Sequence, residues 1–160
     1  SNSGGYQSNA FTIKDPLVYK FWFEILPTIQ NMLSLYNIGY NYDTNIDNLW
    51  FNVNRKHNYN HVHMHPGSEF SGVYYLEAPT DCGNLTFYNP NKALNNVVFY
   101  NRNFGTYNEF NSLQYHVKPK KDLLVLFPAF LEHSVDMNLS DEPRISLAFN
   151  IQVKPEGQNE

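Results

Sequence analysis

The stretch YNHVHMHPGSEFSGVYYL, residues 59–76, gives the strongest indication of the fold. In its first half, histidines alternate with Val62 and Met64, and a period of two residues is typical of a β-strand. A Pro-Gly pair interrupts this pattern, and a second strand-like segment, Phe70–Leu76, follows it. The stretch therefore predicts two short strands separated by a turn.

Strand-like segments of the same kind recur through most of the chain. Leu49, Phe51 and Val53 point to one face of a predicted strand, and the residues between them point to the other. Clusters of Pro, Gly, Asn and Asp separate the segments. The predicted strands are residues 48–54, 59–65, 70–76, 84–87, 97–100, 113–117, 122–127, 132–136 and 144–153. Such a series predicts a mainly β fold, a double-stranded β-helix (jelly roll), with its core at about residues 48–153.

The start of the chain predicts helix instead of strand. Asp15 and Pro16 form an N-cap followed by a proline at the first helical position, and apolar residues then recur at helical spacing. Pro27 predicts either a kink or the start of a second helix, which would end near Gly39. We therefore expect one or two helices, over about residues 15–38, to pack outside the sheets.

Length and composition predict one domain. The chain has 160 residues, the usual size of a single domain, and no linker or internal repeat divides it. Aromatic residues make up 16% of the chain, and their side chains favour half-buried strand surfaces. Residues 89–111, rich in Asn and Phe, are expected to form a long loop over one end of the barrel. We therefore expect residues 1–160 to form one domain.

Charge and cysteine content exclude several classes of partner. The formal net charge is −4 and no run of Lys or Arg is present, so nucleic acid is not an expected partner. No apolar stretch is long enough for a membrane span or for the core of a signal peptide. The lone Cys82 cannot form an intramolecular disulfide, which favours a reducing cytoplasm.

The histidine run predicts a metal site. On a regular strand, His61, His63 and His65 share one face, and side chains two residues apart can converge on one metal ion. A facial site needs a further ligand from a distant strand. His133 follows an apolar strand and a turn at Pro128, and it offers that ligand. Any one of these histidines alone would more often be structural, whereas the cluster favours metal binding.

The last predicted strand carries an arginine on its polar face. Arg144, Ser146 and Asn150 share this face, and a buried guanidinium needs an anion. Its planar fork can bind a carboxylate through two parallel hydrogen bonds, so a carboxylate ligand is one candidate. The alternative is a structural salt bridge to a nearby acid, Asp141 or Glu142.

These features together resemble the 2-oxoglutarate- and Fe(II)-dependent oxygenases, in particular the compact bacterial and phage group. The resemblance covers nearly the whole chain, from Gly4 to Asn150. Its motifs, in order, are Trp50-x-Asn52, His63-x-His65-Pro66, Ser71–Leu76, Gly83–Phe87, Phe127-Pro128 with His133, and Arg144-x-Ser146. It implies a dioxygenase that uses Fe(II), O₂ and 2-oxoglutarate to hydroxylate an unactivated C–H of a protein or peptide residue or a small molecule, releasing succinate and CO₂.

The resemblance also assigns site residues. It implies that the catalytic iron is held by His63, His65 and His133. It places the cosubstrate against Arg144, Ser146, Asn54, Tyr75 and Asn150. Most of the superfamily has His-x-Asp or His-x-Glu at the first two ligand positions, so the ligand taken here as His65 could instead be His61 or Glu69. Pro66 directly after His65 favours His63 and His65, as in the family's motif.

Two other functions remain compatible with a jelly roll. A cupin-type dioxygenase or isomerase would bind metal through His63, His65, Glu69 and His133 without 2-oxoglutarate. The Arg144-x-Ser146 motif favours the oxygenase, because a cupin has no need of it. A non-catalytic binding or virion module is the second alternative, and it predicts no tight metal binding.

Overall fold

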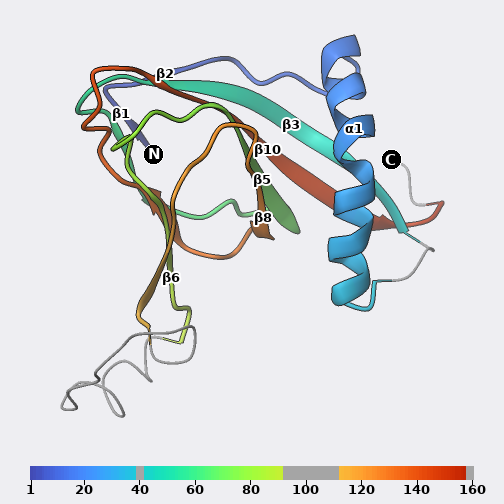
Figure 1. Cartoon of the computed structure of the whole chain (residues 1–160). Coiled ribbons are helices and arrows are strands. Elements are labelled where there is room, and N and C mark those ends of the chain that lie inside the picture. The colour runs from blue at the N-terminus through green and yellow to red at the C-terminus, as the bar shows by residue number, and fades with distance from the viewer. Residues whose placement is uncertain (39–41, 92–111, 158–160) are drawn as a thin grey trace.

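The computed structural model describes residues 1–38, 42–91 and 112–157. Its strands form two five-stranded antiparallel sheets that face each other (Figure 1). The short sheet has the order β1 (Asn2–Ser3), β4 (Tyr59–His63), β9 (His133–Val135), β6 (Leu85–Tyr88), β7 (Gln114–Val117). The long sheet has the order β2 (Tyr6–Gln7), β3 (Tyr42–Asn54), β10 (Arg144–Pro155), β5 (Phe70–Glu77), β8 (Leu124–Pro128). The predicted mainly β jelly roll is confirmed.

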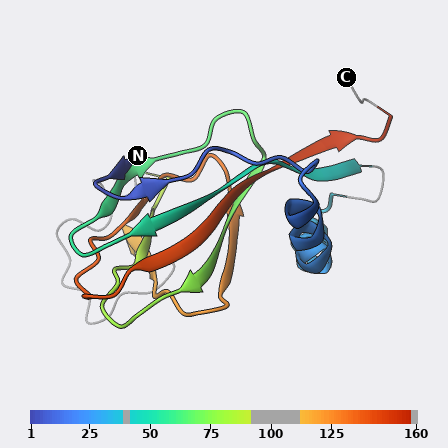
Figure 2. The ribbon, with the colours of Figure 1, turned by 90° about the horizontal axis from the view of Figure 1, so that it is seen from above.

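Strands β3, β5 and β10 of the long sheet extend further than the sequence predicts. β3 begins six residues before the expected start at Asn48, and it pairs with β10 over its full length. Figure 2 shows these two strands running together past the barrel. The short strands β1 and β2 were not predicted, because two residues are too few to show a period. The predicted strand 97–100 and most of the predicted loop 89–111 lie outside the described residues.

One helix, α1 (Pro16–Leu35), precedes the long sheet. The carboxylate of Asp15 caps it by accepting a hydrogen bond from a backbone N–H of the first turn. The helix continues through Pro27, so the predicted second helix does not form. Asn37, with φ of 55°, supplies the left-handed residue after its end, whereas the predicted stop at Gly39 lies outside the described residues.

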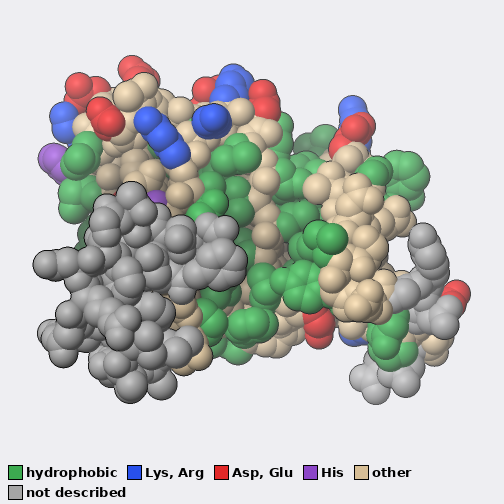
Figure 3. Space-filling view, turned by 60° about the horizontal axis from the view of Figure 1, so that its bottom comes forward, with side chains coloured by type: hydrophobic (Ala, Val, Ile, Leu, Met, Phe, Trp, Pro, Cys, Tyr) green, Lys and Arg blue, Asp and Glu red, His purple; other side chains and the backbone are tan. Residues whose placement is uncertain are grey.

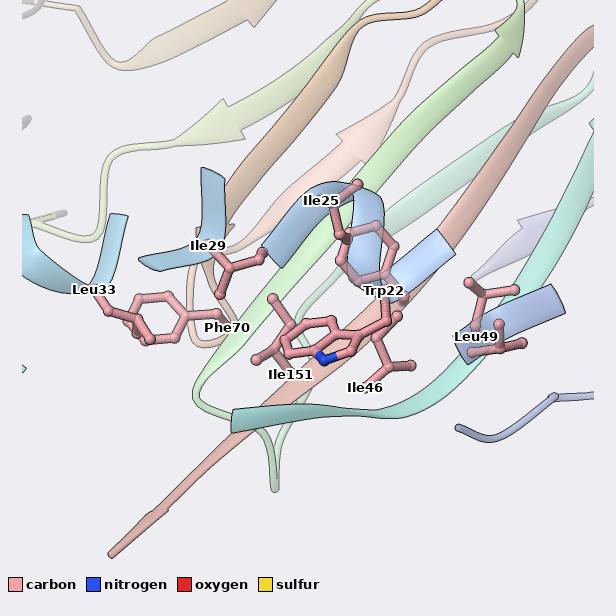
Figure 4. Close-up of a cluster of buried hydrophobic side chains, with 10 residues drawn as sticks. Trp22, Ile25, Ile29, Leu33, Ile46, Leu49, Phe70 and Ile151 are labelled. Atoms are coloured by element: carbon pink, nitrogen blue, oxygen red, sulfur yellow. The ribbon is translucent and has the colours of Figure 1, made fainter. Parts of the chain in front are cut away.

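The apolar stripe of α1 packs on the outer face of the long sheet (Figure 4). Its buried residues, three to four positions apart, are Val18, Trp22, Ile25, Ile29 and Leu33. They contact residues of β3, β5 and β10, namely Ile46, Leu49, Phe70, Phe149 and Ile151. Each fully buried side chain of this size contributes roughly 1.5–3 kcal/mol to stability. The larger apolar core therefore lies on the outer face of the long sheet. A smaller apolar cluster around Leu85, Phe87 and Phe127 lies between the sheets, beside the polar groups.

The surface carries charges of both signs. Figure 3 shows Lys and Arg side chains beside Asp and Glu side chains along one edge of the visible face. Two exposed pairs, Lys56 with Asp141 and Lys121 with Glu77, have N–O distances of 2.7 and 2.8 Å. Within the described residues, no helix has the length and apolar composition needed to cross a bilayer.

The Gly72→Ala substitution should test the packing of β5 against β10. A Cβ at Gly72 would lie 2.2–2.8 Å from ring atoms of Phe149, which is fully buried and cannot move aside. We expect the free energy of unfolding to fall by about 1–3 kcal/mol, measured by denaturant titration. In a Phe149→Leu background the same change should cost much less. An equal cost in both backgrounds would contradict this interpretation.

Candidate functional site

Three histidines form a cluster between the two sheets. The ring nitrogens of His63, His65 and His133 all lie within 4.8 Å of one another. His63 ends β4 and pairs directly with His133, the first residue of β9. His65 follows two residues later, where its backbone N–H donates to the carbonyl of Ala129 at 2.9 Å. The cluster brings three imidazoles from two strands and a turn to one point, as a single metal ion requires.

A β-bulge in β4 decides which histidines join the cluster. Asn60 pairs with Val135 and His63 pairs with His133, so β4 has one residue more than β9 between these two pairs. The extra residue lets Asn60 and His63 line the same cavity. His61 is exposed and lies against the ring of Tyr59 instead. The prediction that His61, His63 and His65 share one face was therefore wrong.

Glu69, the carboxylate of the cupin pattern, also lies apart from the cluster. Its side chain is exposed, and one carboxylate oxygen accepts a hydrogen bond of 2.9 Å from the backbone N–H of Val153. Of the three candidates left open by the sequence, the structure brings only His65 beside His63 and His133.

Backbone carbonyls fix the orientation of two of the rings. The carbonyl of His61 lies 2.7 Å from Nδ1 of His63, and that of Leu131 lies 2.9 Å from Nδ1 of His133. A carbonyl can only accept, so each Nδ1 carries the proton and each Nε2 has a lone pair that can bind a metal. The hydroxyl of Ser1 lies 3.3 Å from Nε2 of His63. The ring of His65 stacks on Trp50, with centroids 5.8 Å apart and an interplanar angle of 17°.

The histidines of the cluster favour the neutral form. Burial lowers the pKa of His65 to about 4, and repulsion by a charged His63 adds to this effect. Burial likewise lowers the pKa of His133 to about 4, and it also lowers the pKa of His63. Neutral imidazole is the form that binds metal, so at neutral pH the cluster needs to lose no proton before it binds an ion.

Arg144 lies in the same cavity with one end of its guanidinium unpaired. It is 1% exposed, and its Nη1 donates to the carbonyls of Cys82 and Asp136. Its Nη2 is buried without a hydrogen-bond partner. No carboxylate among the described residues forms an ion pair with Arg144, and Asp141 pairs with Lys56 instead. The alternative of a structural salt bridge to Asp141 or Glu142 was therefore wrong, and the buried charge still needs an anion.

The cavity that joins Arg144 to the histidines is small, with a volume of about 130 Å³. Sites for drug-sized ligands measure roughly 300–1,000 Å³, so this cavity suits a ligand smaller than those. Its walls include three more of the residues that the sequence assigned to the cosubstrate, namely Asn54, Tyr75 and Ser146. Burial raises the pKa of Tyr75, so its hydroxyl stays a hydrogen-bond donor.

Asn150 occupies a different position. Its Oδ1 accepts from the hydroxyl of Ser71 at 2.8 Å, and its Nδ2 donates to Asn48 at 2.9 Å. A hydrogen bond between its side chain and His65 raises the pKa of His65, which partly offsets the effect of burial. Asn150 thus lies beside the histidine cluster and not on the wall of the cavity, and its contact with a cosubstrate stays a prediction.

Some residues of the cavity wall were missed by the sequence reasoning. They are Ser1, Gln7, Asn52 and Asn60. For Asn52 a signal was present, since Trp50, Asn52 and Asn54 share one face of a regular strand. For Ser1, Gln7 and Asn60 there was none, because their positions depend on short strands and on the bulge in β4.

The comparison with protein families identifies this architecture. The family model "Putative 2OG-Fe(II) oxygenase" matches residues 48–150, which include all three histidines and Arg144. The chain belongs to this oxygenase family. The match confirms the resemblance that the sequence motifs indicated. No curated protein sequence matches the chain.

Solved structures of similar fold include other oxygenases. A 2OG-Fe(II) oxygenase family oxidoreductase from Burkholderia pseudomallei has a TM-score of 0.55 at 17% identity, covering 79% of this chain and 57% of that protein. A Pseudomonas putida prolyl-4-hydroxylase has a TM-score of 0.56 at 14% identity, covering 91% and 67%. The viral collagen prolyl hydroxylase of Paramecium bursaria Chlorella virus-1 has a TM-score of 0.54 at 15% identity, covering 92% and 78%. At these identities the likeness shows the fold alone.

The family implies Fe(II) and 2-oxoglutarate, and the residues of this oxygenase fit both groups. The histidines of the cluster favour the neutral form, and Nε2 of His63 and of His133 carries a lone pair, the kind of donor that Fe(II) accepts. The unpaired Nη2 of Arg144 and the unpaired Nδ2 of Asn54 are buried donors in the same cavity. A dicarboxylate supplies the acceptors that these two groups lack.

Single histidine substitutions should show which histidines bind Fe(II). We expect His63→Ala and His133→Ala to weaken Fe(II) binding by at least about 10–100-fold, because each removes a nitrogen donor. His61→Ala is the matched control from the same run, and it should leave the affinity unchanged because His61 is exposed. Anaerobic competition with a chelator measures the affinity, and thermal unfolding checks each fold. Equal losses in His61→Ala and His133→Ala would contradict the assignment.

Proposed function

We propose that this oxygenase is an Fe(II)- and 2-oxoglutarate-dependent dioxygenase that hydroxylates an unactivated C–H, releasing succinate and CO₂. The observation that carries the proposal is the buried, unpaired Nη2 of Arg144 in one cavity with three neutral imidazoles. A metal-binding cupin needs the imidazoles but no buried cation, and its expected ligand Glu69 lies elsewhere. A non-catalytic module needs neither group.

The proposal gives each side chain a role. His63, His65 and His133 each hold Fe(II) through one ring nitrogen. Arg144 neutralises the far carboxylate of 2-oxoglutarate and fixes its direction. Ser146, two residues further along the same face of β10, adds a hydroxyl. When bound, Fe(II) and 2-oxoglutarate supply the O₂-dependent oxidising chemistry that protein side chains lack.

Two further groups complete the proposed cosubstrate site. Asn54 is the direct cross-strand neighbour of Arg144, and its Nδ2 can donate to the same carboxylate. Tyr75 is the cross-strand neighbour of Ser146, and its protonated hydroxyl can donate as well. Apolar side chains line the rest of the cavity and limit access of water to the reacting centre: Leu85, Val73, Phe127 and Val135.

The size of the cavity bears on the substrate. A volume of about 130 Å³ leaves little room beside a bound dicarboxylate, so the substrate must present its reacting C–H at the mouth. This favours a residue of a protein or peptide over a small molecule that is enclosed whole. The fold does not decide the reaction, since a non-haem epimerase, SnoN, has a TM-score of 0.54 to this chain as well.

The remaining parts of the proposal follow from the sequence. We propose that residues 1–160 act as one oxygenase domain with O₂ and an organic substrate as its partners. The lone Cys82 is buried and unpaired, which agrees with a reducing location such as the cytoplasm.

Substitution of Arg144 tests the proposed cosubstrate site. In an anaerobic titration, the wild type should develop a visible charge-transfer band only when both Fe(II) and 2-oxoglutarate are present. Arg144→Met should raise the Kd for 2-oxoglutarate by roughly 30-fold or more, because truncating one partner of a buried charge pair costs at least about 2 kcal/mol. Fe(II) affinity should not change.

The exposed Arg55, in the turn after β3, gives the matched control. Arg55→Met should leave the band and the Kd for 2-oxoglutarate as in the wild type. Tight Fe(II) binding without any response to 2-oxoglutarate in the wild type would refute the oxygenase proposal and favour a cupin-type enzyme.

A further inference from the structure

A polar row crosses the cavity face of the long sheet. The strand register places Gln7 beside Asn52, Asn52 beside Ser146, and Ser146 beside Tyr75. All four residues line the cavity. Tyr75 is 1% exposed and Asn52 is 7% exposed, whereas Gln7 is exposed. The row therefore leads from the interior, where the proposed cosubstrate site lies, to the rim of the cavity.

Within this row, Asn52 has a hydrogen-bond acceptor without a donor. Its Oδ1 is buried and has no hydrogen-bond partner among the described residues. The proposed cosubstrate cannot satisfy it, because 2-oxoglutarate at neutral pH carries two carboxylates and a keto group, all of which are acceptors. Arg144 and Asn54 offer the donors that such a ligand needs, but Asn52 needs an N–H or O–H from another molecule.

The surroundings of Asn52 indicate what kind of molecule provides this donor. Gln7 adds a second carboxamide at the rim, with an N–H₂ group that can donate to a carbonyl. Trp50, two residues along β3, stacks on His65 and gives a flat surface beside the proposed metal ligands. Apart from Arg144, no Lys, Arg, Asp or Glu lines the cavity in the described part of the chain, so a charged substrate group would find no further charged side chain there.

We propose that Asn52 and Gln7 form a carboxamide pair that binds a neutral, peptide-type amide of the substrate. The amide N–H donates to Oδ1 of Asn52, and the amide carbonyl accepts from Nε2 of Gln7. This holds the neighbouring C–H beside the histidine cluster. The inference rests on the proposed function and narrows its substrate to amide-containing molecules such as peptides. Gln7 lies outside residues 48–150, so this part of the site is not included in the family match.

Thermal unfolding of the metal-free protein provides the first test. Asn52→Leu should raise Tm, because it removes a buried acceptor that the free protein leaves unpaired. Asn138 is the matched control, since it is fully buried and its amide bonds to Asn54, Ser140 and Glu142. Asn138→Leu should lower Tm. A comparable loss of Tm in Asn52→Leu would show a structural role and overturn the proposal.

Binding of a capped proline probe provides the second test. Acetyl-proline N-methylamide has a single N–H donor, and acetyl-proline N,N-dimethylamide has none. Titration of the protein loaded anaerobically with Fe(II) and 2-oxoglutarate can follow tryptophan fluorescence, because Trp50 lines the cavity whereas Trp22 lies in the core under α1. The methylamide should bind the wild type at least about tenfold more tightly than the dimethylamide, and Asn52→Leu should abolish that preference. Gln7→Leu should instead weaken the binding of both probes and leave the preference in place, because both probes carry the carbonyl that accepts from Gln7. Gln114→Leu, on the exposed strand β7, should retain both the affinity and the preference.

The outcomes separate the two proposals. If the wild type shows no 2-oxoglutarate response, the proposed function itself fails. If that response is normal but the two probes bind equally, or neither binds, only the carboxamide pair is refuted. A rise in the Kd for 2-oxoglutarate in Asn52→Leu comparable to that in Arg144→Met would assign Asn52 to the cosubstrate and overturn the inference in the same way.

Discussion

The pairing of β10 with β3 on one side and β5 on the other is the constraint on which the rest of the structure depends. Because side chains alternate along β10, one face of this strand carries Arg144 and Ser146 into the cavity, and the other carries Leu147 and Phe149 toward α1. The same register that buries the apolar core under the helix therefore sets the position of the buried guanidinium. A slip of one residue would exchange the two faces and lose both.

The cavity concentrates groups that are unfavourable without a ligand. An unpaired guanidinium nitrogen, two unpaired carboxamide atoms and histidines with lowered pKa values share one small space, while the apolar core lies mostly on the other face of the long sheet. Apolar side chains in these positions would be compatible with the fold and would avoid the cost of desolvation. Their absence is best explained by ligands that supply the missing partners, as expected where function and local stability conflict.

Patterns within one stretch of sequence predicted the strands, the helix start and the position of Arg144. Features that depend on how two strands pair were missed. The period of two, the Asp15-Pro16 helix start and the position of Arg144 are local, so the sequence displays them. The bulge that turns His61 away depends on the pairing of β4 with β9, which no local pattern contains. The second helix that Pro27 could have started is absent for a different reason: Pro27 lies on the exposed face of α1, where water can bond the carbonyl that a proline leaves free.

The first seven residues tie the two sheets together at the site. β1 pairs with β4 of the short sheet and β2 pairs with β3 of the long sheet, so the Gly4-Gly5 turn crosses from one sheet to the other. A Cβ at Gly5 would lie 2.6–2.7 Å from side-chain atoms of Asn2 and Asn54, which shows how closely this turn packs over the end of the cavity that holds Arg144. His63 and His133 lie on the short sheet and Arg144 lies on the long sheet, so the spacing between the proposed metal and carboxylate sites follows from the distance between the sheets. The turn between β1 and β2 spans this distance, and it therefore helps to set the length of the ligand that can bridge the two proposed sites.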